Sequence, residues 1–257
     1  MLPLLLPGPG GTARAEDRVD VELVLAVDIS YSMDEDELRL QRNGYAEAIT
    51  SAEAMNAIQR GPTRRIAVSY VEWAGAAEQK LVMDWTIIDG PESARDFAEK
   101  LLQQPYRRAY RTSISGAMLF SAPLFDRNPY RGLRQVIDIS GDGANNQGIP
   151  VEDAREDVLK RGIVINGLPI LIKRPGSMDM ANLDQYYEEC VIGGEGSFMV
   201  PIKSREQFAA AIRMKLIMEI AGNYEERPRV VPAATARNPL CMAGERQWQE
   251  RMDWMRN

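Results

Sequence analysis

The stretch Leu23-Val24-Leu25-Ala26-Val27-Asp28-Ile29-Ser30-Tyr31-Ser32 decides how this chain folds. Its first five residues are apolar, as expected of a parallel strand that is buried on both faces of a sheet. An acidic residue and two hydroxyls then follow in the spacing D-x-S-x-S, where the strand would leave the sheet. Alternate residues here can direct oxygen atoms to one position, and oxygen-only ligands suit a hard divalent cation such as Mg²⁺. Asp and Ser also cap helices and form turns, so this stretch alone leaves both interpretations open.

Strand and helix patterns alternate along the rest of the chain. Strand patterns cover residues 19–27, 65–73, 79–88, 135–140 and 163–172, with a short one at 198–202. Helical patterns cover residues 34–60, 91–104, 113–125, 151–161, 182–190 and 204–221, and a last short one covers 243–256. The alternation predicts an α/β fold, with a doubly wound, mostly parallel sheet and helices on both faces. The second and third strands are joined by a short turn, which predicts one antiparallel edge strand.

The amino-acid composition excludes several classes of function. The chain has 257 residues and a formal net charge of −6, which argues against a general nucleic-acid binder. It contains no histidine, which excludes Ser-His-Asp catalysis and His-ligated zinc. No stretch approaches the ~20 apolar residues of a membrane span. The length suits one larger domain, or one domain with a tail.

The N-terminus resembles the end of an export signal. Ala13-Arg14-Ala15 has the A-x-A form of a signal-peptidase site. We therefore expect residues 1–15 to be the remnant of an export signal, 16–221 to form the domain and 222–257 to be a C-terminal extension. The alternative is a disordered N-terminus. Export would place the protein in the periplasm or outside the cell.

The two cysteines, Cys190 and Cys241, fit an oxidising compartment. A bridge between them would tie the C-terminal extension to the domain, and it would contribute about 4 kcal/mol in the chain-entropy model. Two unrelated buried thiols are the alternative.

Two further segments extend the metal hypothesis. In open α/β sheets, ligands bind at the carboxyl ends of strands, where the strand order reverses. Asp142 follows the strand pattern 135–140, so it meets Asp28 if the two strands are neighbours. Thr112 stands just before a helix, where its hydroxyl could face the same crevice or simply cap the helix.

Asp28, Ser30, Ser32, Thr112 and Asp142, in this order, resemble the metal-ion-dependent adhesion site of von Willebrand factor type A domains, D-x-S-x-S … T … D. The resemblance covers residues 19–221 and looks closest to a bacterial, exported subgroup. It implies a Rossmann-like fold and a bound Mg²⁺, although Mn²⁺ or Ca²⁺ would also accept these oxygens. It also implies a protein partner whose Asp or Glu carboxylate becomes the last metal ligand.

The loop before Thr112 carries Arg107, Arg108, Tyr110 and Arg111, which we predict to bind an acidic partner because Arg binds carboxylates bidentately. A solvated loop is the alternative. The acidic run 34–37 acts in the opposite direction, because it could repel such a partner or merely serve a helix N-terminus.

These features favour a cation-dependent binding module with no catalytic residues. The D-x-S-x-S pattern also resembles the D-x-D-x-T/V of aspartate-based phosphatases, so a Mg²⁺-dependent hydrolase is the alternative, and a scaffold with a weak metal site is a third reading. Neither a Walker-type loop nor a G-x-S-x-G elbow is present. Asp138 lies inside an apolar strand, and we expect it to pair with an arginine because a buried carboxylate needs a partner.

Overall fold

The computed structural model describes residues 17–172, 180, 182–222 and 238–256. Five strands form one sheet: β1 (Asp17–Asp28), β2 (Ile66–Trp73), β3 (Gln79–Ile88), β4 (Tyr130–Gly141) and β5 (Val164–Pro169). Their order is β3-β2-β1-β4-β5, and only β3 runs antiparallel to its neighbour. The predicted fold class, a mostly parallel sheet with one antiparallel edge strand, is confirmed.

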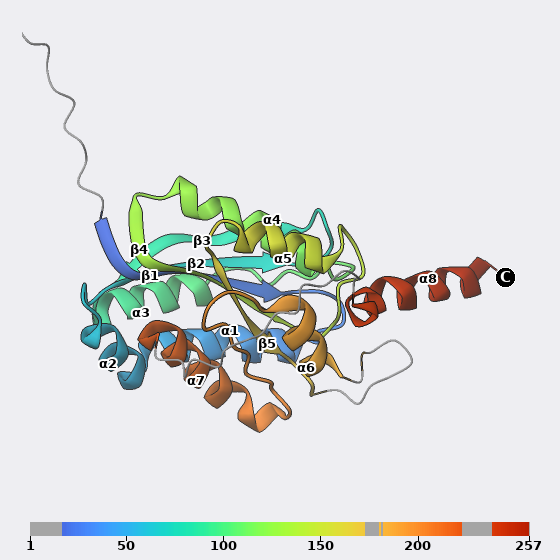
Figure 1. Ribbon diagram of the computed structural model, residues 1–257. Helices are drawn as coiled ribbons and strands as arrows, with labels where there is room; N and C mark the ends of the chain where they lie inside the picture. Colours follow the sequence, from blue (N-terminus) through green and yellow to red (C-terminus); the bar gives the residue numbers. More distant parts are fainter. Residues whose placement is uncertain (1–16, 173–179, 181, 223–237, 257) are drawn as a thin grey trace, which may run out of the picture.

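Helices cover both faces of this sheet (Figure 1). One face carries α1 (Glu35–Thr50), α2 (Ala52–Arg60), α3 (Pro91–Leu102) and α7 (Phe208–Ala221), which pack on one another. The other carries α4 (Ile114–Ser121) and α5 (Val151–Leu159). Shorter helical elements are η1 (Ala122–Arg127), α6 (Leu183–Tyr186), η2 (Tyr187–Val191), η3 (Arg205–Gln207) and η4 (Pro239–Met242). The last helix, α8 (Ala243–Arg256), projects from the body at one end of the sheet (Figure 1).

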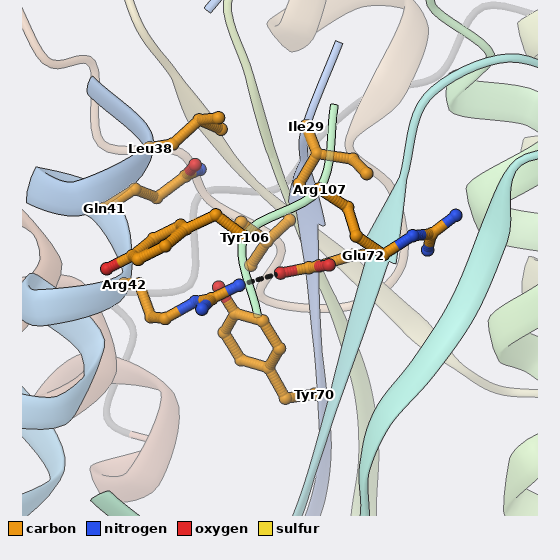
Figure 2. Close-up of a pocket in the computed structure, with 9 residues that line it drawn as sticks. Ile29, Leu38, Gln41, Arg42, Tyr70, Glu72, Tyr106 and Arg107 are labelled. Atoms are coloured by element: carbon orange, nitrogen blue, oxygen red, sulfur yellow. Dashed lines mark hydrogen bonds and ion pairs between the residues drawn. The ribbon is translucent and has the colours of Figure 1, made fainter. Parts of the chain in front are cut away.

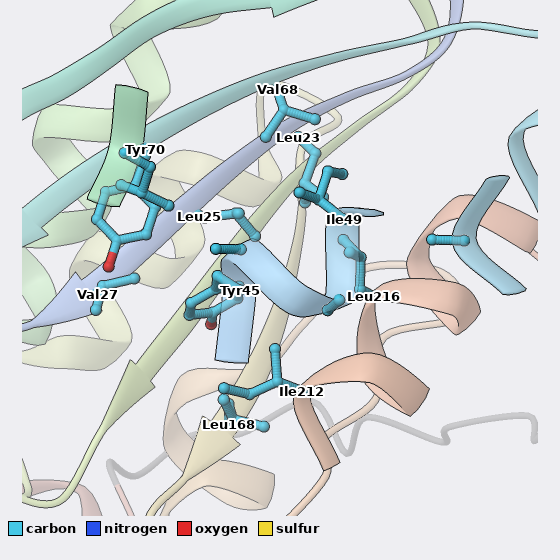
Figure 3. Close-up of a cluster of buried hydrophobic side chains, with 14 of the residues drawn as sticks. Leu23, Leu25, Val27, Tyr45, Ile49, Val68, Tyr70, Leu168, Ile212 and Leu216 are labelled. Atoms are coloured by element: carbon cyan, nitrogen blue, oxygen red, sulfur yellow. The ribbon is translucent and has the colours of Figure 1, made fainter. Parts of the chain in front are cut away.

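The apolar run of β1 is buried because the strand is central and covered on both sides. Leu23, Leu25 and Val27 belong to the core under α1 and α7, where they pack with Tyr45 and Ile212 (Figure 3). Val24 and Ala26 point to the opposite core under α4 and α5. Two-sided burial explains the unbroken hydrophobic run, since each successive side chain enters one of two cores.

The structure corrects two sequence expectations. The helix expected over 34–60 is two helices, because Ser51 adopts an extended conformation and its hydroxyl accepts a hydrogen bond from the backbone N–H of Ala54. Ser51 therefore ends α1 and caps α2. The short strand expected over 198–202 makes only isolated bridges, in which Met199 pairs with Gly167 and Ile202 with Ile170.

A disulfide ties η4, just before α8, to η2. Cys190 in η2 and Cys241 in η4 form a disulfide, as expected. The helix expected over 243–256 is α8. The expected export-signal remnant lies outside the described residues, as do residues 223–237 of the extension. No helix in the described ranges combines the length and apolar character needed to cross a membrane.

Candidate metal centre

The sheet topology brings the two predicted carboxylates together. β1 pairs in parallel with β4, and Val27 lies opposite Ser140. Asp28 and the Gly141-Asp142 turn therefore leave neighbouring strands at the same carboxyl edge. The strand order reverses between β1 and β4, which is where open α/β sheets bind ligands. The fit at this point is tight, because a β-carbon added at Gly141 would lie 2.8 Å from Oδ2 of Asp28.

A chain of hydrogen bonds links the D-x-S-x-S turn to Asp142. The Ser30 backbone N–H donates to Oδ1 of Asp28 at 2.7 Å. The hydroxyls of Ser30 and Ser32 are 2.6 Å apart, and the Ser32 hydroxyl donates to Oδ1 of Asp142 at 2.5 Å. Hydrogen bonds thus link four of the five predicted ligands into one set.

Thr112 joins this set through the loop that follows Asp142. Its backbone N–H donates to Oδ1 of Asn146 at 3.0 Å, and the Asn146 N–H donates to the Thr112 carbonyl at 2.8 Å. A β-carbon added at Gly143 would lie 3.6 Å from the Thr112 hydroxyl, so that hydroxyl faces the turn after β4. Thr112 is not the helix cap, because Ser113 accepts the capping hydrogen bond from Gly116.

Asp28 is a fully buried carboxylate. Its side chain is 0% exposed, and Oδ2 has no hydrogen-bond partner in the described part of the chain. Burial, and then the negative charge of Asp142, raise the pKa of Asp28 to about 8. A buried carboxylate in this state favours either a proton or a nearby cation.

The donor set fits a hard cation. The described ranges contain no group of three or more His, Cys, Asp or Glu side chains placed to hold a metal ion. The set instead combines two carboxylates with three hydroxyls, all of them oxygen ligands. Such a set, with water completing the shell, suits Mg²⁺, and two carboxylates would neutralise its charge.

Side chains of the acidic run at residues 34–37, beside the site, make local hydrogen bonds and ion pairs. Asp34 and Glu37 form a capping box at the start of α1, each accepting a backbone hydrogen bond at 2.8 Å. Arg205 pairs with Asp34 at 2.7 Å and lies 3.9 Å from Asp36. The run therefore serves the helix N-terminus, and Arg205 offsets part of its charge.

The four predicted partner-binding residues have different surroundings. Arg107 pairs with Glu78 at 3.5 Å. Arg108 donates to the carbonyls of Tyr31 and Met33, at 3.1 and 2.5 Å, which fixes this loop to the D-x-S-x-S turn. Tyr110 is 74% exposed, and its ring centroid lies 4.4 Å from that of Tyr31. Arg111, beside Thr112, stacks on Trp248 of α8.

A buried ion pair beneath this loop escaped the sequence analysis. Arg42 of α1 pairs with Glu72 of β2 (Figure 2). Its guanidinium also donates to the Gln104 carbonyl at 2.6 Å. The Tyr106 ring covers the guanidinium at 4.0 Å. The pair lines a cavity of about 10 Å³ and anchors the start of the loop that leads to Thr112. Only the polar residues inside the apolar patterns of α1 and β2 hinted at it.

The structure corrects the predicted partner of Asp138. Asp138 pairs with Lys215 of α7 at 2.5 Å, not with an arginine, and accepts a hydrogen bond from Tyr45 at 3.3 Å. Lys215 also pairs with Glu219 one turn along α7. One compact ammonium group thus reaches both carboxylates.

Comparison with solved structures places this architecture among known folds. The pilus adhesin SpaC of Lactobacillus rhamnosus GG has a TM-score of 0.59 at 11% identity over 80% of this chain and 31% of its own. Proximal thread matrix protein 1 from the mussel byssus scores 0.56 at 11% identity, over 80% and 48%. The vWF domain of the type V pilus tip protein Mfa5 from Porphyromonas gingivalis scores 0.56 at 9% identity, over 80% and 97%.

These similarities show the fold, which is that of von Willebrand factor type A domains. The chain spans less than half the length of the mussel and Lactobacillus proteins. One structure of the mussel protein is described as having a zinc-occupied MIDAS motif. A search of curated proteins found no match. Residues 18–224 match the family model described as "Protein of unknown function (DUF1194)", and the chain therefore belongs to that family.

Proposed function

We propose that this protein is a divalent-cation-dependent binding module that recruits a protein partner without turnover. The observation that carries the proposal is the buried Oδ2 of Asp28 at the carboxyl edge of the sheet, which has no hydrogen-bond partner among the described residues. Asp28, Ser30, Ser32, Thr112 and Asp142 would hold a Mg²⁺-type ion, directly or through water. Mn²⁺ and Ca²⁺ are chemically acceptable substitutes.

The partner would supply the last ligand. Two carboxylates leave the ion neutralised but incompletely coordinated by protein, so an added carboxylate from Asp or Glu meets little net repulsion. The pairing of Arg205 with the acidic run reduces the negative potential near the site and supports this proposal. The similar structures include a pilus adhesin and a pilus tip protein, which supports an adhesion-type role.

The rim of the site has the composition of a contact surface. Tyr31 and Tyr110 stack with exposed fractions of 47% and 74%, and the Arg108 guanidinium lies 4.6 Å from the Tyr31 ring centroid. Exposed tyrosines held in place by arginine lose little conformational entropy on binding, and both residue types are enriched in binding hot spots. We propose that this rim contacts the partner around the metal.

The protein would act after export, in the periplasm or outside the cell. The Cys190–Cys241 disulfide supports this location, because such bonds persist in oxidising compartments.

Calorimetric titration of Mg²⁺, Mn²⁺ and Ca²⁺ into metal-stripped protein tests the metal site. We expect saturable binding by the wild type and none by the Asp28→Ala, Asp142→Ala double variant. An Asp153→Ala variant, on α5, is the control and should bind like the wild type. Equal heats for the wild type and the double variant would contradict the proposed site.

The requirement for a partner carboxylate is tested with acetate and acetamide as competing probes in the metal-loaded protein. Acetate should perturb the NMR signals of residues at the rim only when Mg²⁺ is present, and acetamide should not. Identical perturbations without Mg²⁺ would contradict the role of the metal.

A further inference from the structure

Helix α8 is fixed to the loop that follows Asp142. The Cys190–Cys241 disulfide holds the residues just before the helix. Gly244 packs against the backbone of Asn145 so closely that an added β-carbon would lie 2.1 Å from its carbonyl oxygen. The Asn145 side chain donates to Glu245 at 2.7 Å. The first turn of α8 is therefore a rigid neighbour of the candidate metal centre.

One turn further, α8 meets the residue that precedes Thr112. The Arg111 guanidinium carbon lies 3.3 Å from the centroid of the Trp248 ring, and that of Arg251 lies 5.4 Å from the same centroid. Arg111 has a positive φ of 76°, a conformation that is rare for a residue with a β-carbon. The backbone and the indole together fix where this guanidinium points.

Among the described residues, Arg111 differs from the other arginines near the site in its hydrogen bonding. Other arginines near the site are engaged: Arg42 with Glu72, Arg107 with Glu78, and Arg108 with two carbonyls. In the described part of the chain, no group accepts a hydrogen bond from the Arg111 guanidinium, and that side chain is only partly buried.

A second guanidinium, that of Arg251, lies against the same ring and adds positive charge beside Arg111. A stacked guanidinium with free N–H donors is the arrangement that binds a carboxylate bidentately. This pair of cations lies beside the residue that carries one of the proposed metal ligands, so an anion bound here would sit next to the metal.

We propose that Arg111, held in place by Trp248 of α8, is a second anchoring point that binds a carboxylate of the partner beside the one on the metal. The inference rests on the proposed function and narrows its ligand to a protein segment with two neighbouring acidic residues. Helix α8 then lines one side of the binding site, and the disulfide fixes the position of the helix relative to the metal.

Two short peptides test this proposal, acetyl-Gly-Asp-Gly-amide with one carboxylate and acetyl-Gly-Asp-Gly-Glu-Gly-amide with two. Their affinities for Mg²⁺-loaded protein are measured by NMR titration at millimolar concentrations. We expect the two-carboxylate peptide to bind about tenfold more tightly, as one charge-assisted bidentate contact allows. Arg111→Met should remove this gain, so that the two peptides bind the variant with equal affinity.

Further variants separate a positioning role for Trp248 from a general effect of charge. Trp248→Phe should keep most of the higher affinity for the two-carboxylate peptide, and Trp248→Ala should lose most of it. Arg246→Met, which removes an exposed positive charge from the same helix, should keep all of it.

Equal affinities for the two peptides in the wild type, a gain that persists in Arg111→Met, or no binding of either peptide would overturn the proposal. Failure of the proposed function gives a different result. The two-carboxylate peptide would then bind with the same Arg111 dependence whether Mg²⁺ or a chelator is present.

Discussion

Asp28 and Asp138 are both carboxylates buried in the sheet, but the protein surrounds them differently. Asp138 lies inside β4 and has a lysine from α7 at 2.5 Å. Asp28 lies at the end of β1, and among the described residues no basic side chain forms an ion pair with it. Where the fold supplies the cation, the carboxylate belongs to the core. Where it does not, the site is open to a cation from solution.

The same contrast appears in how the two sites are connected. Asp138 and Lys215 join strand β4 to helix α7, and Glu219 and Tyr45 extend this buried network. Asp28 accepts a hydrogen bond from the Ser30 backbone N–H, and the hydroxyls of Ser30 and of the exposed Ser32 continue the chain to Asp142. A buried ionic network supports structure, whereas a hydrogen-bonded chain that reaches the surface supports exchange with ions from solvent.

The largest effect should come from removing the built-in cation. Lys215→Met leaves two buried carboxylates without a counter-charge and should lower the free energy of unfolding by about 3–5 kcal/mol. Urea denaturation measures this loss. Lys203→Met, at an exposed lysine, is the control and should change stability by less than about 0.5 kcal/mol. If Lys215→Met lost as little stability as the control, Lys215 would not be the counter-charge that stabilises Asp138, and the contrast with Asp28 would fail.

The pH dependence of stability reports the same network. Burial, and then the charge of Asp138, raise the pKa of Glu219 to about 7 from its ordinary 4.5. The folded protein therefore holds this proton more tightly than the unfolded chain. The stabilisation is complete below pH 4.5 and is lost as pH rises through about 7.

Glu219→Gln removes this titration. As pH rises from 4.5 through about 7, the free energy of unfolding of the wild type should fall by on the order of 3 kcal/mol relative to that of the variant. Denaturant titrations at several pH values measure the difference, and Glu47→Gln, at an exposed position, should follow the wild type. Parallel pH profiles for the wild type and Glu219→Gln would show that Glu219 titrates normally.

A smaller effect is expected at the edge of the metal site. Ser32→Ala removes the hydroxyl that bridges Ser30 and Asp142, and it should weaken Mg²⁺ binding about tenfold. Because Ser32 is exposed, metal-free stability should change by less than about 0.5 kcal/mol. Calorimetry and denaturation measure the two quantities, with Ser197→Ala as the control. A large stability loss without a change in Mg²⁺ affinity would make Ser32 a structural residue.

The sequence predicts the sheet and the meeting of Asp28 with Asp142 because both follow from local patterns. A buried apolar run must end at an edge, and parallel strands end at the same edge. The break at Ser51 was not predicted, because the helical pattern continues through it. The Asp138–Lys215 pair and the contact of Trp248 with Arg111 were missed because they join distant segments, and no periodicity encodes such contacts.

The account rests on the proposal that the Asp28 carboxylate binds a divalent cation from solution. The direct test compares the free energy of unfolding of the wild type and Asp28→Asn, with and without Mg²⁺. The two should be similar without metal, because the raised pKa of Asp28 leaves that group largely protonated at neutral pH. At a Mg²⁺ concentration about 100 times the dissociation constant, the wild type should gain about 2.7 kcal/mol and the variant nothing. An equal gain in both proteins, or none in the wild type, would contradict the account.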